Sequence, residues 1–351
     1  MERILIVGAG LTGALTAAHI RSELSKSCNI MILEKARGAG GRMTTTRSSQ
    51  MPLESTCDLG AQYISLTTEY AQKHQSIYEN LLNKGLLEQL VGEIVGEPSD
   101  VSTKHYVAPT GVSSLTKHFL EQAEPDIKYK HLVTKIKGQT DSQHLRVKTE
   151  EGVAWEFDTV ILTMPVPQIL QLKGDVQDII SSNCGVREKL GKVSYSSRYA
   201  LCMFFTQGTK LDVPWVAKYV TGNKCIRFLS IDNKKRGIDS QQCCPSLLVH
   251  TSVPFGLKHL EQDKLAVQSE IIQELKEVWP KLPEPCEVKV QKWLYSQVHH
   301  GYEGSPGCVV LRERPFLILA GDGFVHSNFD GCVESAQSVI RYMKSKSVPK
   351  L

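Results

Sequence analysis

Three glycines near the start of the sequence have the spacing of a turn that binds the phosphates of a nucleotide. Gly8, Gly10 and Gly13 follow the apolar run 3–7, and apolar residues at helical spacing come directly after them. In this kind of turn the first glycine allows the tight bend and the second lets a pyrophosphate approach the backbone. The third lets the helix pack closely on the strand. The free N–H groups at the start of such a helix hold phosphate.

An acidic residue stands where a nucleotide-binding unit needs one. A second apolar run, 29–33, ends in Glu34, about 20 residues beyond Gly13, where a carboxylate can bind the hydroxyls of an adenosine ribose. This order predicts a dinucleotide site, and the alternative is a glycine-rich turn without a ligand. The motif alone does not distinguish NAD from FAD. The candidate cofactor-binding residues of this stretch are Gly8, Gly10, Thr12, Gly13, Glu34 and Lys35.

Later segments favour FAD by resemblance. The segment 40–43, Gly-Gly-Arg-Met, resembles the FAD-binding segment of the amine oxidase-like flavoprotein superfamily, and 58–63 resembles the segment that passes under the flavin ring there. The apolar run 316–320 with Gly-Asp-Gly after it resembles the same superfamily. The alternatives are a surface cation for Arg42 and a core valine for Val133. The resemblance implies FAD, with contacts from Gly41, Arg42, Gly60, Ala61, Gln62, Val133, Asp322 and the amide of Val333.

The order of the apolar runs and this resemblance together predict an α/β protein of two domains. The first is a Rossmann-type FAD-binding domain, like that of p-hydroxybenzoate hydroxylase and the amine oxidases. The second is a mostly antiparallel α+β substrate domain. The expected boundaries are 1–85, 108–167 and 296–345 for the FAD-binding domain, 86–107 and 168–295 for the substrate domain, and 346–351 for a basic tail.

Local patterns give further predictions for single elements. Apolar residues at helical spacing predict one helix over 67–87. Runs at 90–95 and 104–107 predict two paired strands around a turn at 98–100. A single strand is expected over 129–136 and another over 190–193.

Composition and charge narrow the class of function. A net charge of +4 without a basic stripe gives no case for nucleic acid, and the run 234–236 is expected to be a solvated loop. No apolar run is long enough to predict a membrane span. None of the ten cysteines forms a CxxC pair, so we expect free thiols and no metal. The thiols favour a cytoplasmic location. Cleavage of an N-terminal leader would remove the glycine turn, so we expect the first strand to be retained.

Some stretches resemble one family within the superfamily, among them 195–199 and 230–236. This resemblance implies a monomeric oxidase that converts the 2- and 6-dihydro isomers of NAD(P)H to NAD(P)+. Its electrons pass to dioxygen and give hydrogen peroxide. The alternatives are a catecholamine or monoamine oxidase, and a secreted signalling ligand that binds a cell-surface receptor independently of catalysis. Secretion conflicts with the cytoplasmic location that the cysteines favour.

The chemistry favours the dihydronicotinamide reaction. A dihydropyridine regains aromaticity when it loses hydride, so no general base is required and no catalytic residue is predicted besides the flavin itself. The site must hold the ring flat with its donor carbon about 3–3.5 Å from the hydride acceptor. Amine oxidation instead requires the amine as free base and a site that selects it. No feature of the sequence identifies such a base.

For the aromatic candidates of the substrate site, the alternative is a place in a hydrophobic core. Arg198, Arg227 and Lys234 are candidates to bind a substrate phosphate, against the alternative of solvated charge at strand edges. The candidate substrate lining is Gln62, Tyr63, Tyr219, Phe228 and Trp293, with Trp215 and Tyr295 as further aromatic residues.

Overall fold

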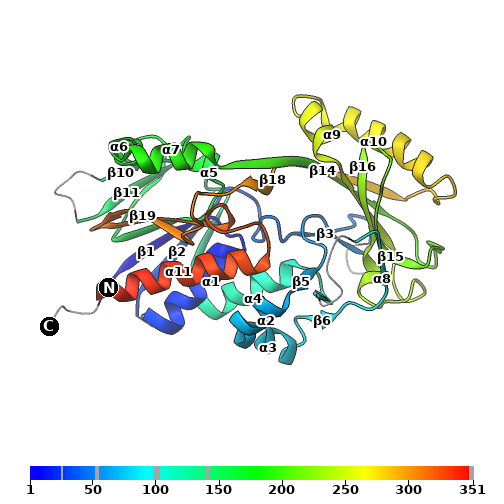
Figure 1. The fold of residues 1–351 in the computed structure, drawn as a ribbon, viewed down its shortest axis with the longest axis horizontal. Helices are drawn as coiled ribbons and strands as arrows, with labels where there is room; N and C mark the ends of the chain where they lie inside the picture. Colours follow the sequence, from blue (N-terminus) through cyan, green and yellow to red (C-terminus); the bar gives the residue numbers. More distant parts are fainter. Residues whose placement is uncertain (25–26, 52–54, 98–102, 139–142, 348–351) are drawn as a thin grey trace. The chain divides into compact units, whose positions relative to one another are not determined.

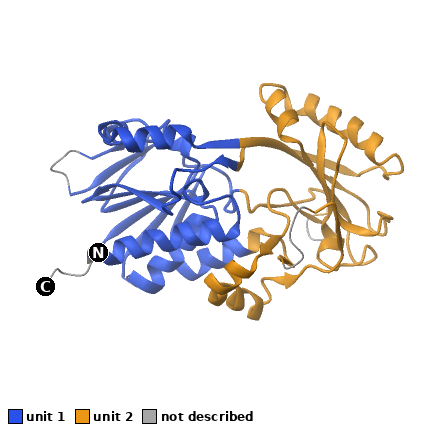
Figure 2. Ribbon diagram, viewed as in Figure 1, with its two compact units in different colours: residues 1–41, 115–195, 298–351 blue, residues 42–114, 196–297 orange. Residues whose placement is uncertain are grey.

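The computed structural model describes residues 1–24, 27–51, 55–97, 103–138 and 143–347. The chain forms two compact units, each built from segments that are distant in the sequence (Figure 2). Within the described ranges, no helix has the length and apolar character needed to cross a membrane. Unit 1 comprises 1–41, 115–195 and 298–351, and unit 2 comprises 42–114 and 196–297.

A six-stranded, mostly parallel sheet forms the centre of unit 1, in the order β19-β20-β13-β1-β2-β9. β1 pairs in parallel with β2 on one side and with β13 on the other, so the strand order reverses at β1. In open α/β sheets, ligands bind beyond the carboxyl ends of the strands at such a point. The bounds are β1 Arg3–Val7, β2 Asn29–Glu34, β9 Asp126–Tyr129, β13 Thr159–Leu162, β19 Cys308–Glu313 and β20 Phe316–Ala320.

Layers cover both faces of this sheet, which is why its strands are apolar on both sides. Figure 1 shows α1 and α11 side by side on one face, and the strands β10–β11 with α6 and α7 on the other. Leu5 and Val7 of β1 belong to one core with Ile136 and Leu145. The bounds are α1 Leu11–His19, the π-helical turn η1 Ile20–Leu24, α4 Ser113–Ala123, β10 Val133–Lys137, β11 Leu145–Thr149, β12 Ala154–Phe157, α5 Val166–Ile169, α6 Asp175–Ser182, α7 Cys184–Lys192, the 3-10 turn η2 Asp322–Phe324 and α11 Phe329–Ser347.

Unit 2 is built on a second six-stranded sheet, in the order β18-β14-β17-β16-β15-β7. Side chains alternate between its faces. Leu201, Leu229 and Val249 pack with residues of α10 in one core, whereas Ala200 and Leu248 pack with Cys57 and Leu59 in another. The bounds are β7 Glu93–Val95, β14 Ser194–Phe204, β15 Trp215–Tyr219, β16 Ile226–Ile231, β17 Ser246–Thr251, α9 Val253–Lys258, α10 Lys264–Val278 and β18 Glu287–His300.

Small elements complete unit 2. β3 and β4 form an antiparallel pair, and β5, β8 and β6 form a three-stranded sheet. The short helix α8 follows β16 directly. The bounds are β3 Thr45–Arg47, β4 Thr56–Asp58, β5 Ile64–Leu66, α2 Thr68–Lys73, α3 Gln75–Asn83, β6 Glu88–Gln89, β8 Lys104–Val107 and α8 Asp232–Lys235.

Several local predictions were wrong. The helix over 67–87 is two helices, because His74 leaves the helical conformation between α2 and α3. The paired strands do not form, since β7 pairs with β15 and β8 with β5 and β6. Lys130, with φ +60°, ends β9 and separates it from β10. Residues 190–193 end α7 instead of forming a strand. The turn at 98–100 lies outside the described residues.

The α/β fold with an antiparallel second domain is confirmed, but the boundaries differ from those expected. Residues 42–85 belong to unit 2, because Cys57 and Leu59 pack in its core. Residues 168–195 belong to unit 1, because Val176 and Leu190 pack in the other core. Lys346 is part of α11, and 348–351 lie outside the described residues.

Candidate functional site

The three glycines of the first turn differ in what the fold requires of them. Gly8 has φ +111°, and a Cβ there would lie 2.9 Å from Thr163 Oγ1. A Cβ at Gly13 would lie 2.1 Å from the carbonyl oxygen of Gly8. A Cβ at Gly10 would meet no atom of the described residues within 4 Å. Packing and backbone conformation therefore explain Gly8 and Gly13. Gly10 instead leaves open space at the N-cap of α1, where a phosphate can approach.

The second glycine pair lies beside this turn. The Gly40 amide donates to the carbonyl oxygen of Ala9 at 2.9 Å, and Gly40 and Gly10 form a parallel bridge. Gly41 has φ +55°, and a Cβ there would lie 3.5 Å from the Cα of Gly10. Two motifs from separate parts of the sequence thus meet at Gly10. This open, glycine-lined backbone fits the pyrophosphate of a dinucleotide.

Glu34 lies at the end of β2 and orders the backbone around the turn. Its carboxylate accepts hydrogen bonds from the amides of Ala9 and Ala36, at 2.8 and 2.7 Å. Each carboxylate oxygen has a further lone pair, so Glu34 can still accept from ribose hydroxyls. Val133 is buried in the core of unit 1, which agrees with the alternative that it is a core valine. Lys35 is exposed. Thr12 is buried in the first turn of α1.

The late Gly-Asp-Gly segment forms the turn η2 at the end of β20. Asp322 is buried, and its carboxylate accepts a hydrogen bond from Ser327. Val333 is a fully buried residue of α11, one position beyond the four residues at the start of that helix. A helix leaves only its first four N–H groups without an internal acceptor. The helix geometry therefore favours an amide of the first turn over that of Val333 as a donor to a ligand.

In unit 2, the segments 42–45 and 58–62 run side by side. The Ala61 amide donates to the carbonyl oxygen of Arg42 at 3.0 Å. A Cβ at Gly60 would lie 1.9 Å from the same oxygen, so this close approach requires glycine there. Arg42 is half-buried and donates to the carbonyl oxygen of Ser296 at 3.4 Å. Arg42, Gly60 and Ala61, which are all predicted to contact the cofactor, therefore lie next to one another where the two segments meet.

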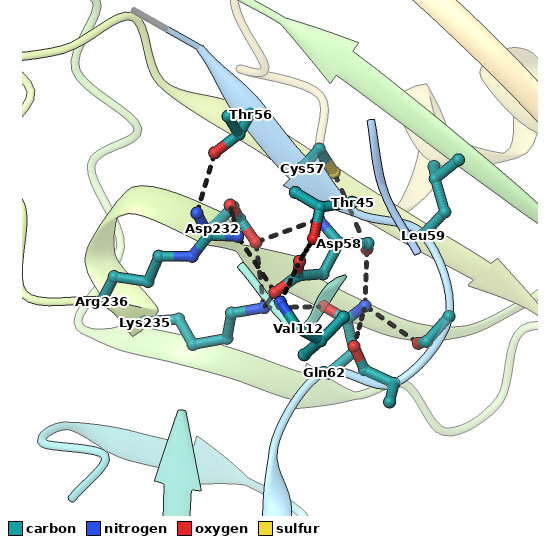
Figure 3. A network of polar contacts seen from close by, with 12 residues as sticks. Thr45, Thr56, Cys57, Asp58, Leu59, Gln62, Val112, Asp232, Lys235 and Arg236 are labelled. Carbon is teal, nitrogen blue, oxygen red and sulfur yellow. Dashed lines mark hydrogen bonds and ion pairs between the residues drawn. The ribbon is translucent and has the colours of Figure 1, made fainter. Parts of the chain in front are cut away.

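A buried ionic cluster supports this segment (Figure 3). It consists of Asp58, Asp232, Lys235 and Arg236, whose side chains are at most 3% exposed. Lys235 Nζ lies 3.0 Å from Asp58 and 2.9 Å from Asp232, and Arg236 lies 3.0 and 2.6 Å from the same two carboxylates. Burial alone would raise the pKa of Asp58, but the charges of Lys235 and Arg236 lower it overall. The run 234–236 is therefore not the solvated loop that we expected.

Gln62 has an internal role that differs from the predicted one. Its Nε2 donates to the carbonyl oxygens of Asp58 and Gly60, at 2.6 and 3.0 Å, and its Oε1 accepts from Lys235 at 3.3 Å (Figure 3). The side chain thereby closes the loop that the ionic cluster holds. These hydrogen bonds use both ends of the side-chain amide of Gln62 to stabilise the loop.

Three ring residues, two of them predicted and one new, lie next to one another on adjacent strands of the six-stranded sheet of unit 2. Tyr219 pairs with Phe228, Phe228 with His250, and His250 with Ala200. We name Tyr219, Phe228 and His250 the aromatic row. Their ring centroids are 5.0 Å apart for Tyr219 and Phe228 and 6.0 Å apart for Phe228 and His250. Ala200 packs on the face opposite α10, so the row lies on that face as well.

Two further candidates have different positions. Trp293 packs against the core that contains Ala200, and its Nε1 donates to the carbonyl oxygen of Leu59 at 3.3 Å. Trp215 is buried in the core with α10 and contacts Trp279 edge-on. Trp215 is therefore a core residue, and its proposed place in the substrate lining was wrong.

His250 is a further candidate residue that the sequence patterns did not predict. Its Nε2 lies 2.8 Å from the carbonyl oxygen of Leu59, which can only accept, so Nε2 carries a proton. Burial lowers the pKa of His250 to about 4, which keeps the ring neutral at pH 7. Its Nδ1 then presents a lone pair. A single histidine in an apolar strand gives no local signal, and only the strand register places it beside Phe228.

A chain of hydrogen bonds runs from the aromatic row through Tyr63. The hydroxyls of Tyr219 and Tyr63 are 2.7 Å apart, and Tyr63 donates to Glu97 Oε1 at 3.1 Å. Glu97 Oε2 lies 3.0 Å from His105 Nε2. Burial and the bond with Tyr219 raise the pKa of Tyr63, so it is a phenol at neutral pH. Since the proton of Tyr63 goes to Glu97, Tyr219 must donate to Tyr63. This leaves the lone pairs of the Tyr219 oxygen as acceptors.

Comparison with known proteins agrees with the fold. Residues 6–81 match the model of an NAD(P)-binding Rossmann-like domain. Renalase of Mus musculus is 45% identical to this chain over 344 residues, which cover 98% of the chain and 99% of the mouse protein. The chain belongs to the renalase family. Membership in this family and the Rossmann-like domain together support the conclusion that the protein is a flavin-dependent oxidoreductase.

Solved structures show the same fold at low sequence identity. A candidate protoporphyrinogen oxidase from Exiguobacterium sp. 255-15 has a TM-score of 0.74 at 16% identity, with 99% of each chain covered. The PF1083 protein from Pyrococcus furiosus has a TM-score of 0.61 at 13% identity, again with 99% of each chain covered. These likenesses extend over the whole length of the renalase-family chain described here.

Proposed function

We propose that this protein is an FAD-dependent oxidase of the 2- and 6-dihydro isomers of NAD(P)H. The balanced reaction consumes the dihydro isomer, one proton and dioxygen, and it yields NAD(P)+ and hydrogen peroxide. FAD, when bound, would accept the hydride and transfer the electrons to dioxygen. The residues of the chain bind and orient the two dinucleotides.

The residues of unit 1 fit the cofactor. Gly10 and Gly41 would allow its pyrophosphate to approach the backbone, because the space over Gly10 is open. Glu34 would accept from the ribose hydroxyls through its remaining lone pairs. Asp322 would face the ribityl or phosphate chain. The dipole of α11 would stabilise negative charge that lies near the N-terminus of this helix.

The aromatic row is the observation that carries the proposal for the substrate. Tyr219, Phe228 and His250 lie in one cross-strand line, in which a nicotinamide ring would be held against the half-buried Tyr219 and His250 rings with the buried Phe228 between them. The Tyr219 oxygen and His250 Nδ1 are both hydrogen-bond acceptors, which suits the NH2 group of a carboxamide. Hydride loss from a dihydropyridine requires no base, and the row contains no free carboxylate within the described residues. Binding in a fixed orientation is the contribution that these residues make.

The amine oxidase alternative is less well supported. The guanidinium of Arg227 lies 5.6 Å from the centroid of the Tyr219 ring, so positive charge is next to the aromatic row. A protonated catecholamine would be repelled there. The described carboxylate of this network, Glu97, is bound by Tyr63 and His105.

Peroxide production from matched substrates tests the proposal. The purified, FAD-loaded protein is supplied with the 2- and 6-dihydro isomers of NAD, with ordinary NADH and with adrenaline, in air. We expect kcat/KM for the isomers to exceed that for NADH and adrenaline by about 100-fold or more, because only the isomers would match the site. Adrenaline as the best substrate would instead support the amine oxidase alternative.

A further inference from the structure

A β-bulge in β16 brings a cation to the aromatic row. Ile226 pairs with Thr251 and Phe228 with His250, so Arg227 is an extra residue between two pairs. Bulges redirect a side chain and are frequent next to active sites. Here the bulge directs Arg227 over the ring of Tyr219, where one guanidinium nitrogen donates to the carbonyl oxygen of Val220 at 3.4 Å.

A second arginine lies on the other side of His250. Arg198 is two residues before Ala200, the partner of His250 on β14, so it projects from the face that carries the aromatic row. Its Nη2 donates to Gln297 Oε1 at 3.2 Å. Its Nε is shielded from solvent and has no hydrogen-bond partner in the described ranges. β14 and β16 flank β17, so the two arginines arise about 10 Å apart, a distance that their side chains can close.

The positive charge of this pair lacks compensation. Among residues 1–24, 27–51, 55–97, 103–138 and 143–347, neither Arg198 nor Arg227 forms a salt bridge, whereas Arg236 in the ionic cluster contacts two carboxylates. Burial lowers the pKa of Arg198, and the charge of Arg227 lowers it further. Arg198 is half-buried and Arg227 is exposed, and an anion bound between them would offset the repulsion of the two like charges. The planar, forked donors of arginine match phosphate oxygens in pairs.

We propose that Arg198 and Arg227 form an anion subsite that binds a phosphate group of the substrate beside the aromatic row. The inference rests on the proposed function, because the row would hold the nicotinamide ring while the arginines bind the phosphate attached through its ribose. The subsite would then distinguish dinucleotides from nicotinamide compounds without phosphate. Arg198 and Arg227 are specificity residues in this account and take no part in hydride transfer.

The test combines two substrates with matched variants. Arg198→Gln, Arg227→Gln and the double variant are compared with wild type on 6-dihydro-NAD and on the corresponding dihydronicotinamide riboside, which lacks phosphate. Arg198→Lys keeps the charge but loses the fork. The exposed Arg146 on β11 provides the control Arg146→Gln. Each single glutamine variant should raise KM for the dinucleotide about tenfold, with kcat changed less than about threefold. The riboside constants should remain within about twofold.

A separate probe avoids dependence on turnover. Binding of inorganic pyrophosphate at low salt is measured by calorimetry on the FAD-loaded full chain. We expect wild type and Arg146→Gln to bind it, and the double variant to lose at least tenfold in affinity. If pyrophosphate binds in this way but no dihydronicotinamide reacts, the anion subsite stands and the proposed function is wrong. Equal effects of the variants on both substrates, or unchanged pyrophosphate affinity in the double variant, would overturn the subsite.

Discussion

Lys235 Nζ lies 3.0 Å from Asp58 Oδ2, with both side chains essentially inaccessible to solvent. Asp58 ends β4, at the start of the loop 58–62, and Lys235 ends α8. Lys235 also contacts Gln62, the residue that closes this loop. One buried cation therefore ties α8 to both ends of the segment that resembles the flavin-contacting segment of the superfamily.

Replacing this cation should destabilise unit 2 strongly. Lys235→Met leaves two buried carboxylates with only Arg236, and an uncompensated buried charge costs about 3–5 kcal/mol. Urea unfolding monitored by tryptophan fluorescence should show this loss. Lys148→Met, at an exposed position of β11, is the control and should change the unfolding free energy by less than about 0.5 kcal/mol. Equal stability of the two variants would show that the ionic cluster does not support the fold.

The neutral state of His250 predicts a pH dependence of stability. Its folded pKa of about 4 lies below the usual value for histidine, about 6.5. Between these values the unfolded chain binds a proton that the folded chain does not. The unfolding free energy should therefore be highest above pH 6.5 and fall as the pH is lowered towards 4. His250→Gln keeps an N–H donor for Leu59 but cannot titrate, so it should reduce the slope.

Urea unfolding at pH 4.5, 5.5 and 7 measures that slope. His299→Gln, at an exposed histidine, controls for the introduction of glutamine. A slope for His250→Gln as steep as that of wild type would mean that another group causes the acid sensitivity.

The glycine turn offers a prediction for the cofactor. Gly10→Ala meets no described atom within 4 Å, so the protein without cofactor should keep its Tm, whereas its affinity for FAD should fall at least about tenfold. Gly38→Ala is the matched control, since Gly38 also has open space, and it should retain FAD. Gly13→Ala should instead lower the stability itself, because its Cβ would clash with the carbonyl of Gly8. Fluorescence titration with FAD and thermal melts distinguish these outcomes.

Tyr63 should affect the substrate and leave the cofactor bound. Tyr63→Phe removes the acceptor for Tyr219 and the donor to Glu97. A net hydrogen bond contributes about 0.5–1.5 kcal/mol, so KM for the dihydro isomers should rise about 2- to 10-fold. Tyr342→Phe, on the exposed side of α11, is the control. Loss of FAD from Tyr63→Phe would show a structural role instead.

The nucleotide-binding segment 3–34 of unit 1 could be predicted well from the sequence because its signals are local. The apolar strands β1 and β2, the glycines between them and Glu34 are adjacent in the chain, and each has a distinct physical requirement. In unit 2, the runs 90–95 and 104–107 predicted strands where β7 and β8 lie, but not the strands that they pair with. β7 pairs with β15, more than a hundred residues away, and no turn signal indicates this.

The candidate substrate residues could not be fully predicted, because they are brought together by contacts that sequence spacing does not reveal. His250 joins Phe228 only through the register of β16 and β17. Arg236 and Lys235 belong to a run of three cations, which is solvated in most proteins. Here Asp232, three and four residues earlier on α8, and Asp58 on β4 compensate them. The carboxylates of α8 and β4 therefore allow Lys235 and Arg236 to be buried, and this charge compensation becomes visible only in the structure.

The most direct measurement of the proposed function is a single turnover without oxygen. The FAD-loaded protein is mixed anaerobically with borohydride-treated NAD+, which contains the isomeric dihydropyridines, and in parallel with NADH and adrenaline, while flavin absorbance is recorded. We expect rapid bleaching by the isomer mixture alone, then recovery of the yellow colour with one equivalent of peroxide when air is admitted. Bleaching by adrenaline but not by the isomers, or no bleaching by any of the three with FAD bound, would contradict the proposed function.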